Sequence, residues 1–279
     1  MYTGRAIAGG VLVALAATVT AVAAARDDHP GTVAVRQVPA AAVPTAKPAP
    51  IPKAAPAPPG LPTISYWHAA QGFPHDPAPH SVAFVAEALR PHRKAAVYDA
   101  PGGTPKAFLP RTMSGLPVTA PVVARRPGWL AVLIPSINRR VGWVPESAGT
   151  VRPLRDQLVA DLSERRLTWL HDGRQRGAWE VAVGSSRTPT PLGRTFVLGR
   201  TITHGDVYAG LDALVLGAIP DDRDALSASL RNGHTAIHAW HDESAFGRSI
   251  SNGCIRVPPE VQRTLLRRLP EGVVLTVVE

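Results

Sequence analysis

The chain has 279 residues and a formal net charge of +9, with 45% hydrophobic and 18% charged residues. This composition supports one large or two smaller folded domains and excludes a wholly disordered chain. The positive charge suits polyanionic partners, but the lysines and arginines are scattered and the few aromatic residues do not interleave with them, so we expect no nucleic-acid ligand.

The N-terminus predicts export. Arg5 precedes an uncharged run over residues 6–25 that ends in small residues, as at the A-x-A exit of a secretory signal. The run is also about long enough to span a bilayer. Residues 1–26 are therefore predicted to be a signal peptide or a membrane anchor, with the rest of the chain exported to the cell envelope.

A linker is predicted over residues 27–62. From residue 39 onward it is mostly proline and alanine, with Lys47 and Lys53 as its cations. Such a segment cannot bury a core and favours an extended, semi-rigid polyproline-like conformation. We expect it to hold a domain away from the membrane.

The composition becomes globular near residue 63. A helix is predicted over residues 81–89, ended by Pro91. Short apolar runs between turn residues then predict β-strands. These strands are expected at residues 95–98, 118–124, 129–134 and 141–145.

The runs G-W-L-x-V-x-x-P and N-x-R-x-G-W-V-P resemble the bacterial SH3-like domain, a small β-barrel, over residues 92–150. The domain is predicted to occupy residues 63–152, including an N-terminal extension. Trp129 and Trp143 are interpreted as core aromatics, with ligand stacking as the alternative.

The remaining residues, 153–279, predict a second domain that is mainly β. Apolar runs between turn residues indicate strands at residues 158–162, 166–170, 178–184 and 272–278. A short helix is expected over residues 259–269, with Leu265 and Leu266 facing inward.

Cys254 is the sole cysteine. In an exported chain it is an intermolecular partner, a buried small hydrophobe or a reactive thiol. The preceding Gly253 permits a tight turn or the close approach of a ligand. A cysteine after such a turn can present its sulfur beside backbone N–H groups that stabilise an oxyanion.

A thiol needs a base to attack a carbonyl at neutral pH, because only a few per cent of it is thiolate. His238 follows the apolar run 235–237, so we expect it at the end of a buried strand. His204, His234 and His241 lie in more polar surroundings. From the residues alone, a catalytic and a structural role for His238 remain equally open.

Two motifs together resemble the L,D-transpeptidase catalytic domain, the YkuD fold. The first combines His238 with the run S-x-G-C-I-R over residues 251–256. The second is the run V-G-x-x-x-T-P-T-P-x-G over residues 183–193, similar to a strand and turn of that family. The resemblance covers about residues 156–279.

The chain departs from the family pattern at two positions. Asn252 stands where many members have histidine, and Ala239 stands where glycine is usual. A positive φ at Ala239 would cost about 1–2 kcal/mol of local strain.

The resemblance implies a mainly β fold, with an SH3-like barrel followed by a YkuD-like β-sandwich with short helices. It implies an L,D-transpeptidase that forms 3→3 cross-links between peptidoglycan stem peptides through a cysteine thioester. Cys254 would be the nucleophile and His238 the proton acceptor and donor. No metal or cofactor is expected, and the oligomeric state is left open.

Further roles follow from the same resemblance. Positioning or oxyanion roles are implied for Gly253, Ala239 and Ser251. Substrate binding is implied for Arg256 and Asn252, with fixing of the loop as the alternative for Arg256. Residues 202–232 are interpreted as a mobile lid or an ordinary surface insertion.

Two alternative functions remain. An L,D-carboxypeptidase or exchange enzyme would share the thioester, and a wall-binding protein would lack catalysis. Two other classes of thiol enzyme fit less well. NlpC/P60 hydrolases place the cysteine before the histidine, and sortases need a T-L-x-T-C run.

Overall fold

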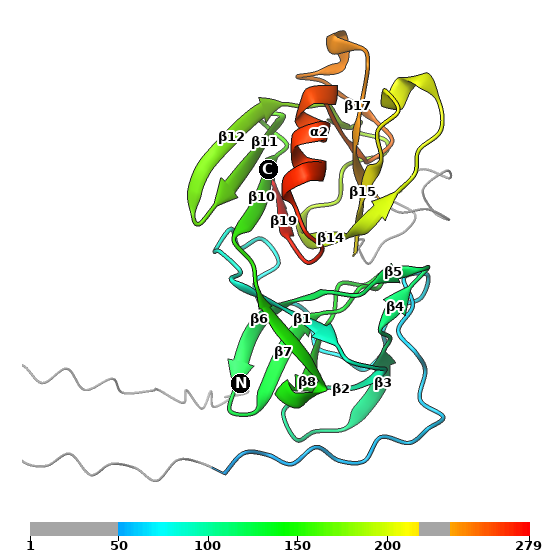
Figure 1. The fold of residues 1–279 in the computed structure, drawn as a ribbon, viewed down its shortest axis with the longest axis vertical. Coiled ribbons are helices and arrows are strands. Elements are labelled where there is room, and N and C mark those ends of the chain that lie inside the picture. The colour runs from blue at the N-terminus through cyan, green and yellow to red at the C-terminus, as the bar shows by residue number, and fades with distance from the viewer. Residues whose placement is uncertain (1–49, 218–234) are drawn as a thin grey trace, which may run out of the picture. The chain divides into compact units, whose positions relative to one another are not determined.

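The computed structural model describes residues 50–217 and 235–279, and over them the chain is mainly β, as predicted (Figure 1). The expected signal or anchor at residues 1–26 lies outside the described residues, as do most of the linker and residues 218–232 of the predicted lid. Within the described part, no helix is long and apolar enough to cross a membrane.

The first sheet covers the predicted domain at residues 63–152. Its strand order is β3 (Pro105–Leu109), β2 (Ala95–Tyr98), β8 (Val141–Pro145), β7 (Trp129–Leu133), β6 (Ala120–Arg126), β1 (Glu87–Pro91) and β9 (Gly149–Pro153). The strands expected at residues 95–98, 118–124, 129–134 and 141–145 correspond to β2, β6, β7 and β8. Trp129 is a core aromatic at 1% exposure, whereas Trp143 is half-buried. The likeness to an SH3-like barrel stays a prediction.

The helix predicted over residues 81–89 is wrong. Residues 81–86 form no regular element, and the rest pairs as β1 between β6 and β9. Backbone carbonyls of this stretch accept hydrogen bonds from distant groups. Ser81 O accepts from Thr276 Oγ1 (3.1 Å), and Val82 O accepts from Gln157 Nε2 (2.8 Å). These long-range bonds replace the local bonds of a helix.

The last part of the predicted linker, residues 50–62, does not stand free. Its Pro52 carbonyl accepts a hydrogen bond from Trp129 Nε1 (2.8 Å), and its Ala55 carbonyl accepts one from the Tyr98 hydroxyl (2.6 Å). The Phe108 N–H donates to Pro62 O at 2.8 Å. This segment therefore lies against the first sheet.

The second sheet carries the C-terminal domain. Its order is β12 (Arg174–Glu180), β11 (Arg166–His171), β10 (Asp156–Asp161), β19 (Val274–Val278), β14 (Gly193–Thr201), β15 (Ala213–Leu216), β16 (Ala236–Ala239) and β18 (Ile255–Val257). β10 pairs in parallel with β19, and β16 pairs in parallel with β18. The strands expected at residues 158–162, 166–170 and 272–278 correspond to β10, β11 and β19, with shifted ends. The run 178–184 is not one strand, because β12 ends at Glu180 and Val183–Gly184 belong to a separate ladder.

The helix α2 (Pro259–Arg268) confirms the predicted C-terminal helix and lies beside the second sheet (Figure 1). Pro259 suits the first turn of the helix, because an N–H group at this position would have no acceptor within the helix. Leu265 is fully buried in the core of this domain, whereas Leu266 packs partly buried at its margin.

Short elements complete the fold. Two small ladders pair β13 (Val183–Gly184) with β17 (Ser249–Ser251), and β4 (Thr112–Met113) with β5 (Leu116–Pro117). Single 3₁₀ turns are formed by Glu146–Ala148, Asp206–Tyr208 and Glu243–Ala245. The β13–β17 ladder matters most here, because it brings the upstream V-G motif beside the strand that leads to Cys254.

Candidate active site

The register of β16 against β18 fixes which side chains share a face. Ile237 pairs with Ile255, and Ala239 pairs with Val257. All four side chains are fully buried in the domain core. Since side chains alternate along a strand, His238 and its partner position Arg256 lie on the opposite face.

Cys254 directly precedes β18, and continuing that strand by one residue would put it opposite Ala236 and on the same face as His238. Two residues of strand rise and one strand spacing separate its Cβ from that of His238 by roughly 8 Å, a gap that the two side chains can largely close. Cys254 as a whole residue is half-buried.

The tautomer of His238 follows from its hydrogen bond. Nδ1 lies 2.8 Å from the Ala239 carbonyl oxygen, which can only accept, so Nδ1 carries the proton. The neutral ring then has Nε2 free of hydrogen, ready to accept a proton. Ala239 is absent from the described residues with positive φ, so alanine causes no strain there and supplies the same carbonyl as glycine.

Burial lowers the pKa of His238 to about 4; the Ala239 carbonyl opposes the shift and the charge of Arg256 adds to it. The ring is 7% exposed. Tyr208, from the 3₁₀ turn Asp206–Tyr208, packs against it edge-to-face with ring centroids 5.0 Å apart. At neutral pH the imidazole is therefore uncharged and available as a base.

This burial predicts an acid-sensitive contribution to stability. The unfolded chain protonates His238 near pH 6.5, but the folded chain does so only near pH 4, so the contribution is full above pH 6.5 and is lost as the pH falls toward 4. Between pH 7 and pH 4, we expect the unfolding free energy of the wild-type chain to drop by about 3 kcal/mol more than that of His238→Gln. Urea unfolding at several pH values measures the difference.

The exposed His241 provides the matched control for this measurement. His241→Gln should keep the wild-type dependence on pH. Identical pH profiles for wild type and His238→Gln would contradict the burial of a neutral imidazole at position 238.

The thiol is also uncharged at rest. Burial raises the pKa of Cys254, and the backbone of Ala236 and the charge of Arg256 oppose this shift only in part. A neutral thiol and a neutral imidazole become an ion pair only if a proton moves from one to the other. Near neutral pH such a thiol would need a base in order to attack a carbonyl.

The loop before Cys254 is held by Ser251. Its hydroxyl donates to the Cys254 carbonyl (2.5 Å) and accepts from the Gly253 N–H (3.1 Å). Gly253 has φ 110°, a conformation that favours glycine. Because Ser251 already takes the Gly253 N–H, this donor does not face an oxyanion here. The Cys254 N–H donates to no acceptor within the described residues and is the better candidate.

The upstream V-G…T-P motif holds the same loop from the other side. The Ser251 carbonyl accepts from Thr188 Oγ1 (2.9 Å) and from the Ser185 N–H (3.0 Å). The Gly184 N–H donates to Thr190 Oγ1 at 2.8 Å. The two sequence motifs therefore meet in space. The motif at residues 183–193 holds the loop at residues 251–254 in position.

Arg256 lies beside the thiol without an acidic partner among the described residues. Its guanidinium carbon lies 3.7 Å from the centroid of the Trp240 ring, and its buried Nε has no hydrogen-bond partner in the described part of the chain. An unpaired guanidinium held by stacking suits a carboxylate of a bound molecule. Asn252 is exposed at the tip of the loop.

The other three candidate histidines have no contact with Cys254 among the described residues. His204 and His241 are exposed, and His234 lies outside the described residues. Across residues 50–217 and 235–279, no group of three or more His, Cys, Asp or Glu side chains is arranged to hold a metal ion.

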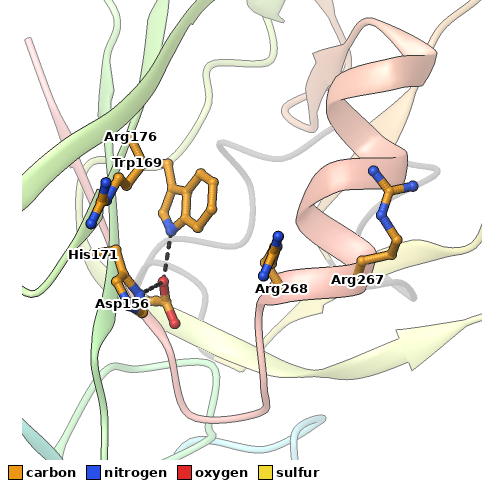
Figure 2. A pocket seen from close by; sticks show the side chains of 6 residues that line it. All are labelled: Asp156, Trp169, His171, Arg176, Arg267 and Arg268. Atoms are coloured by element: carbon orange, nitrogen blue, oxygen red, sulfur yellow. Dashed lines mark hydrogen bonds and ion pairs between the residues drawn. The ribbon is translucent and has the colours of Figure 1, made fainter.

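A separate hollow of about 550 Å³ lies at the outer strands β10–β12 and the end of α2 (Figure 2). Its lining is Asp156, Trp169, His171, Arg176, Arg267 and Arg268. The carboxylate of Asp156 accepts hydrogen bonds from Trp169 Nε1 and His171 Nδ1, both at 2.8 Å (Figure 2). The hollow contains no thiol and no serine or threonine hydroxyl, so it offers no nucleophile for acyl transfer.

Three neighbours of the site escaped the reasoning from sequence: Tyr208, Trp240 and Thr188. Trp240 follows His238 by two residues, so strand alternation could have placed it on the same face. Thr188 belongs to the T-P motif and could have been proposed from it. No sequence signal marks Tyr208, which reaches His238 from a distant turn.

Comparisons with known proteins point to one family. Residues 155–278 match the L,D-transpeptidase catalytic domain family, YkuD. The YkuD protein of Bacillus subtilis (strain 168) is 23% identical over 120 residues, which are 43% of this chain and 64% of that protein. This chain thus spans less than two thirds of the length of that curated relative.

Solved structures with similarity include L,D-transpeptidase 3 from Mycobacterium tuberculosis with a faropenem-derived adduct. It has 18% identity and a TM-score of 0.37, and the match covers 50% of this chain and 74% of that one. The catalytic domain of the Enterococcus faecium L,D-transpeptidase has 22% identity and a TM-score of 0.32, over 44% of this chain and 96% of that one.

Proposed function

We propose that this chain, whose residues 155–278 belong to the L,D-transpeptidase catalytic domain family, is an exported enzyme that forms 3→3 peptidoglycan cross-links through Cys254. The observation that carries the proposal is the β16–β18 register, which pairs His238 with Arg256, two residues after Cys254. The bond from His238 Nδ1 to the Ala239 carbonyl adds support, because it leaves Nε2 as the proton acceptor.

In the proposed acylation, Nε2 of His238 takes the thiol proton as the sulfur attacks the carbonyl of the third residue of a stem tetrapeptide. The Cys254 N–H would stabilise the oxyanion that forms. As the tetrahedral intermediate collapses, the C–N bond to D-Ala breaks, and the imidazolium gives its proton to the leaving amine. The product is a thioester on Cys254.

In the proposed second half, the side-chain amine of another stem attacks the thioester. His238 accepts the amine proton, the C–S bond breaks, and the thiolate recovers a proton from the imidazolium. Arg256 is proposed to bind a carboxylate of the stem peptides through its unpaired guanidinium. Asn252 is proposed to contact the same substrates from the loop tip.

Product analysis with purified disaccharide-tetrapeptide tests this proposal. We expect mass spectrometry to detect a cross-linked dimer and one released D-Ala for each cross-link. A tripeptide without dimer would support the L,D-carboxypeptidase alternative, and incorporation of an added D-amino acid would support exchange. Unchanged tetrapeptide, together with no covalent carbapenem adduct, would reject the enzyme and support a wall-binding protein.

A further inference from the structure

Two aromatic residues of the first sheet form a platform under the proline-rich segment. Tyr98 ends β2 and Trp129 begins β7, and their rings meet edge-to-face with centroids 5.0 Å apart. Both are buried, yet each directs a polar atom, the phenol oxygen or the indole nitrogen, toward residues 50–57. We refer to this pair as the Tyr98–Trp129 platform.

The platform holds the segment by its backbone. Trp129 Nε1 donates to the Pro52 carbonyl at 2.8 Å, and the Tyr98 hydroxyl donates to the Ala55 carbonyl at 2.6 Å. The two acceptors are three residues apart, which is one turn of a polyproline II helix. Residues 50–57 form no helix or strand, as expected of this conformation, which lacks internal hydrogen bonds.

The turns beside the platform approach the segment closely. A Cβ built at Gly102 would lie 2.6 Å from Pro52 Cβ, and one built at Gly128 would lie 2.6 Å from Ile51 Cγ2. Both glycines have positive φ. A side chain at either position would therefore collide with the segment. The segment can lie here only because both turns have glycine at these positions.

The contact is unlike ordinary core packing. Ile51, the largest apolar side chain of the segment, is 60% exposed, and Pro52 is exposed too. What holds the segment is a pair of hydrogen bonds to carbonyls spaced by one turn, over aromatic rings. Aromatic-lined surfaces recognise proline-rich peptides in this manner, because the polyproline II backbone is preformed and presents its carbonyls outward.

We propose that the Tyr98–Trp129 platform is a binding site for a proline-rich peptide in polyproline II conformation, and that residues 51–55 of the same chain are its resident ligand. Residues 51–55 of the predicted linker are then bound to the first sheet. Release of residues 50–62 would lengthen the linker by roughly 40 Å, at about 3.1 Å for each residue. The proposal does not depend on the activity at Cys254.

The indole N–H of Trp129 reports on the site in the full chain. In ¹⁵N-labelled protein we expect this N–H to exchange slowly with solvent. Replacing residues 50–57 by glycine and serine should speed its exchange at least about tenfold, since the hydrogen bond to Pro52 O is lost. Trp129→Phe assigns the resonance, and Trp169→Phe is the control, because the Trp169 indole N–H donates to Asp156 on the second sheet.

Binding of the segment in trans completes the test. A labelled synthetic peptide of residues 49–59 should bind saturably to the glycine–serine variant. Its binding to the wild-type chain should be at least about tenfold weaker, because the resident segment competes at an effective concentration on the order of millimolar. Tyr98→Phe in the variant should weaken peptide binding about threefold to tenfold, the effect of one neutral hydrogen bond.

Three results would overturn the proposal. The first is an exchange rate of the Trp129 indole N–H that the glycine–serine replacement does not change. The others are no saturable peptide binding to a glycine–serine variant that unfolds at the wild-type temperature, and equal peptide affinity with and without Tyr98→Phe. A dimer in the wild-type chain that the replacement abolishes would overturn the assignment of the ligand to the same chain. If the variant fails to fold, Tyr98→Phe in the otherwise wild-type chain must still speed exchange at Trp129, or the proposal fails.

Discussion

Replacing Cys254 by alanine should abolish the covalent adduct of a carbapenem and lower turnover of a tetrapeptide donor by at least about a thousandfold. Cys254 is the sole thiol of the chain. Mass spectrometry of the intact chain counts the adduct, and release of D-Ala measures turnover.

The variant should keep its fold, since the residue is half-buried and the change removes a single sulfur atom. Equal unfolding midpoints for the two chains would establish this. An adduct that persists in Cys254→Ala, or turnover close to wild type, would move the reaction to another residue and remove the basis of the proposed function.

Among the strands around the site, the sequence predicts only β16, through the apolar run 235–237 before His238. In β16 and β18 the apolar positions Ile237, Ala239, Ile255 and Val257 repeat with period two and end at polar turns. One face of each strand enters the core, and that burial determines the register. The same alternation places His238 on the face opposite to the core.

The expected proximity of His238 and the thiol does not follow from alternation alone. It requires that β16 and β18, separated by more than a dozen residues, lie side by side in parallel. Resemblance to the family supplied that long-range information. The contact of Tyr208 with His238 could not be predicted from the sequence, because the 3₁₀ turn of Tyr208 has no periodic pattern that indicates its neighbour.

Two expectations failed for a common physical reason. The stretch 81–89 had helical composition, and residues 50–62 had the composition of a free linker. Both predictions considered only which side chains the segment could bury. In the structure both are held through backbone carbonyls by donors far away in the sequence, such as Gln157 and Trp129. Composition does not record which distant donors are free.

Replacing His238 by alanine should lower kcat/KM for acylation by at least about a hundredfold at pH 7. The reason is that burial raises the pKa of the Cys254 thiol, so without the imidazole almost no nucleophile forms at this pH. In the variant, thiolate arises only by ionisation, and the rate should rise about tenfold for each pH unit below the thiol pKa. His241→Ala, on an exposed neighbour, should retain wild-type rates.

The dependence of wild-type kcat/KM on pH also tests whether His238 is the base. Because kcat/KM reports groups of the free enzyme, its acidic limb should lie near pH 4, where the buried His238 becomes protonated. An ordinary solvated histidine would place that limb near pH 6.5. Normal turnover by His238→Ala would refute the base assignment. A limb near pH 6.5 would instead mean that the working base is a histidine more exposed to water than His238.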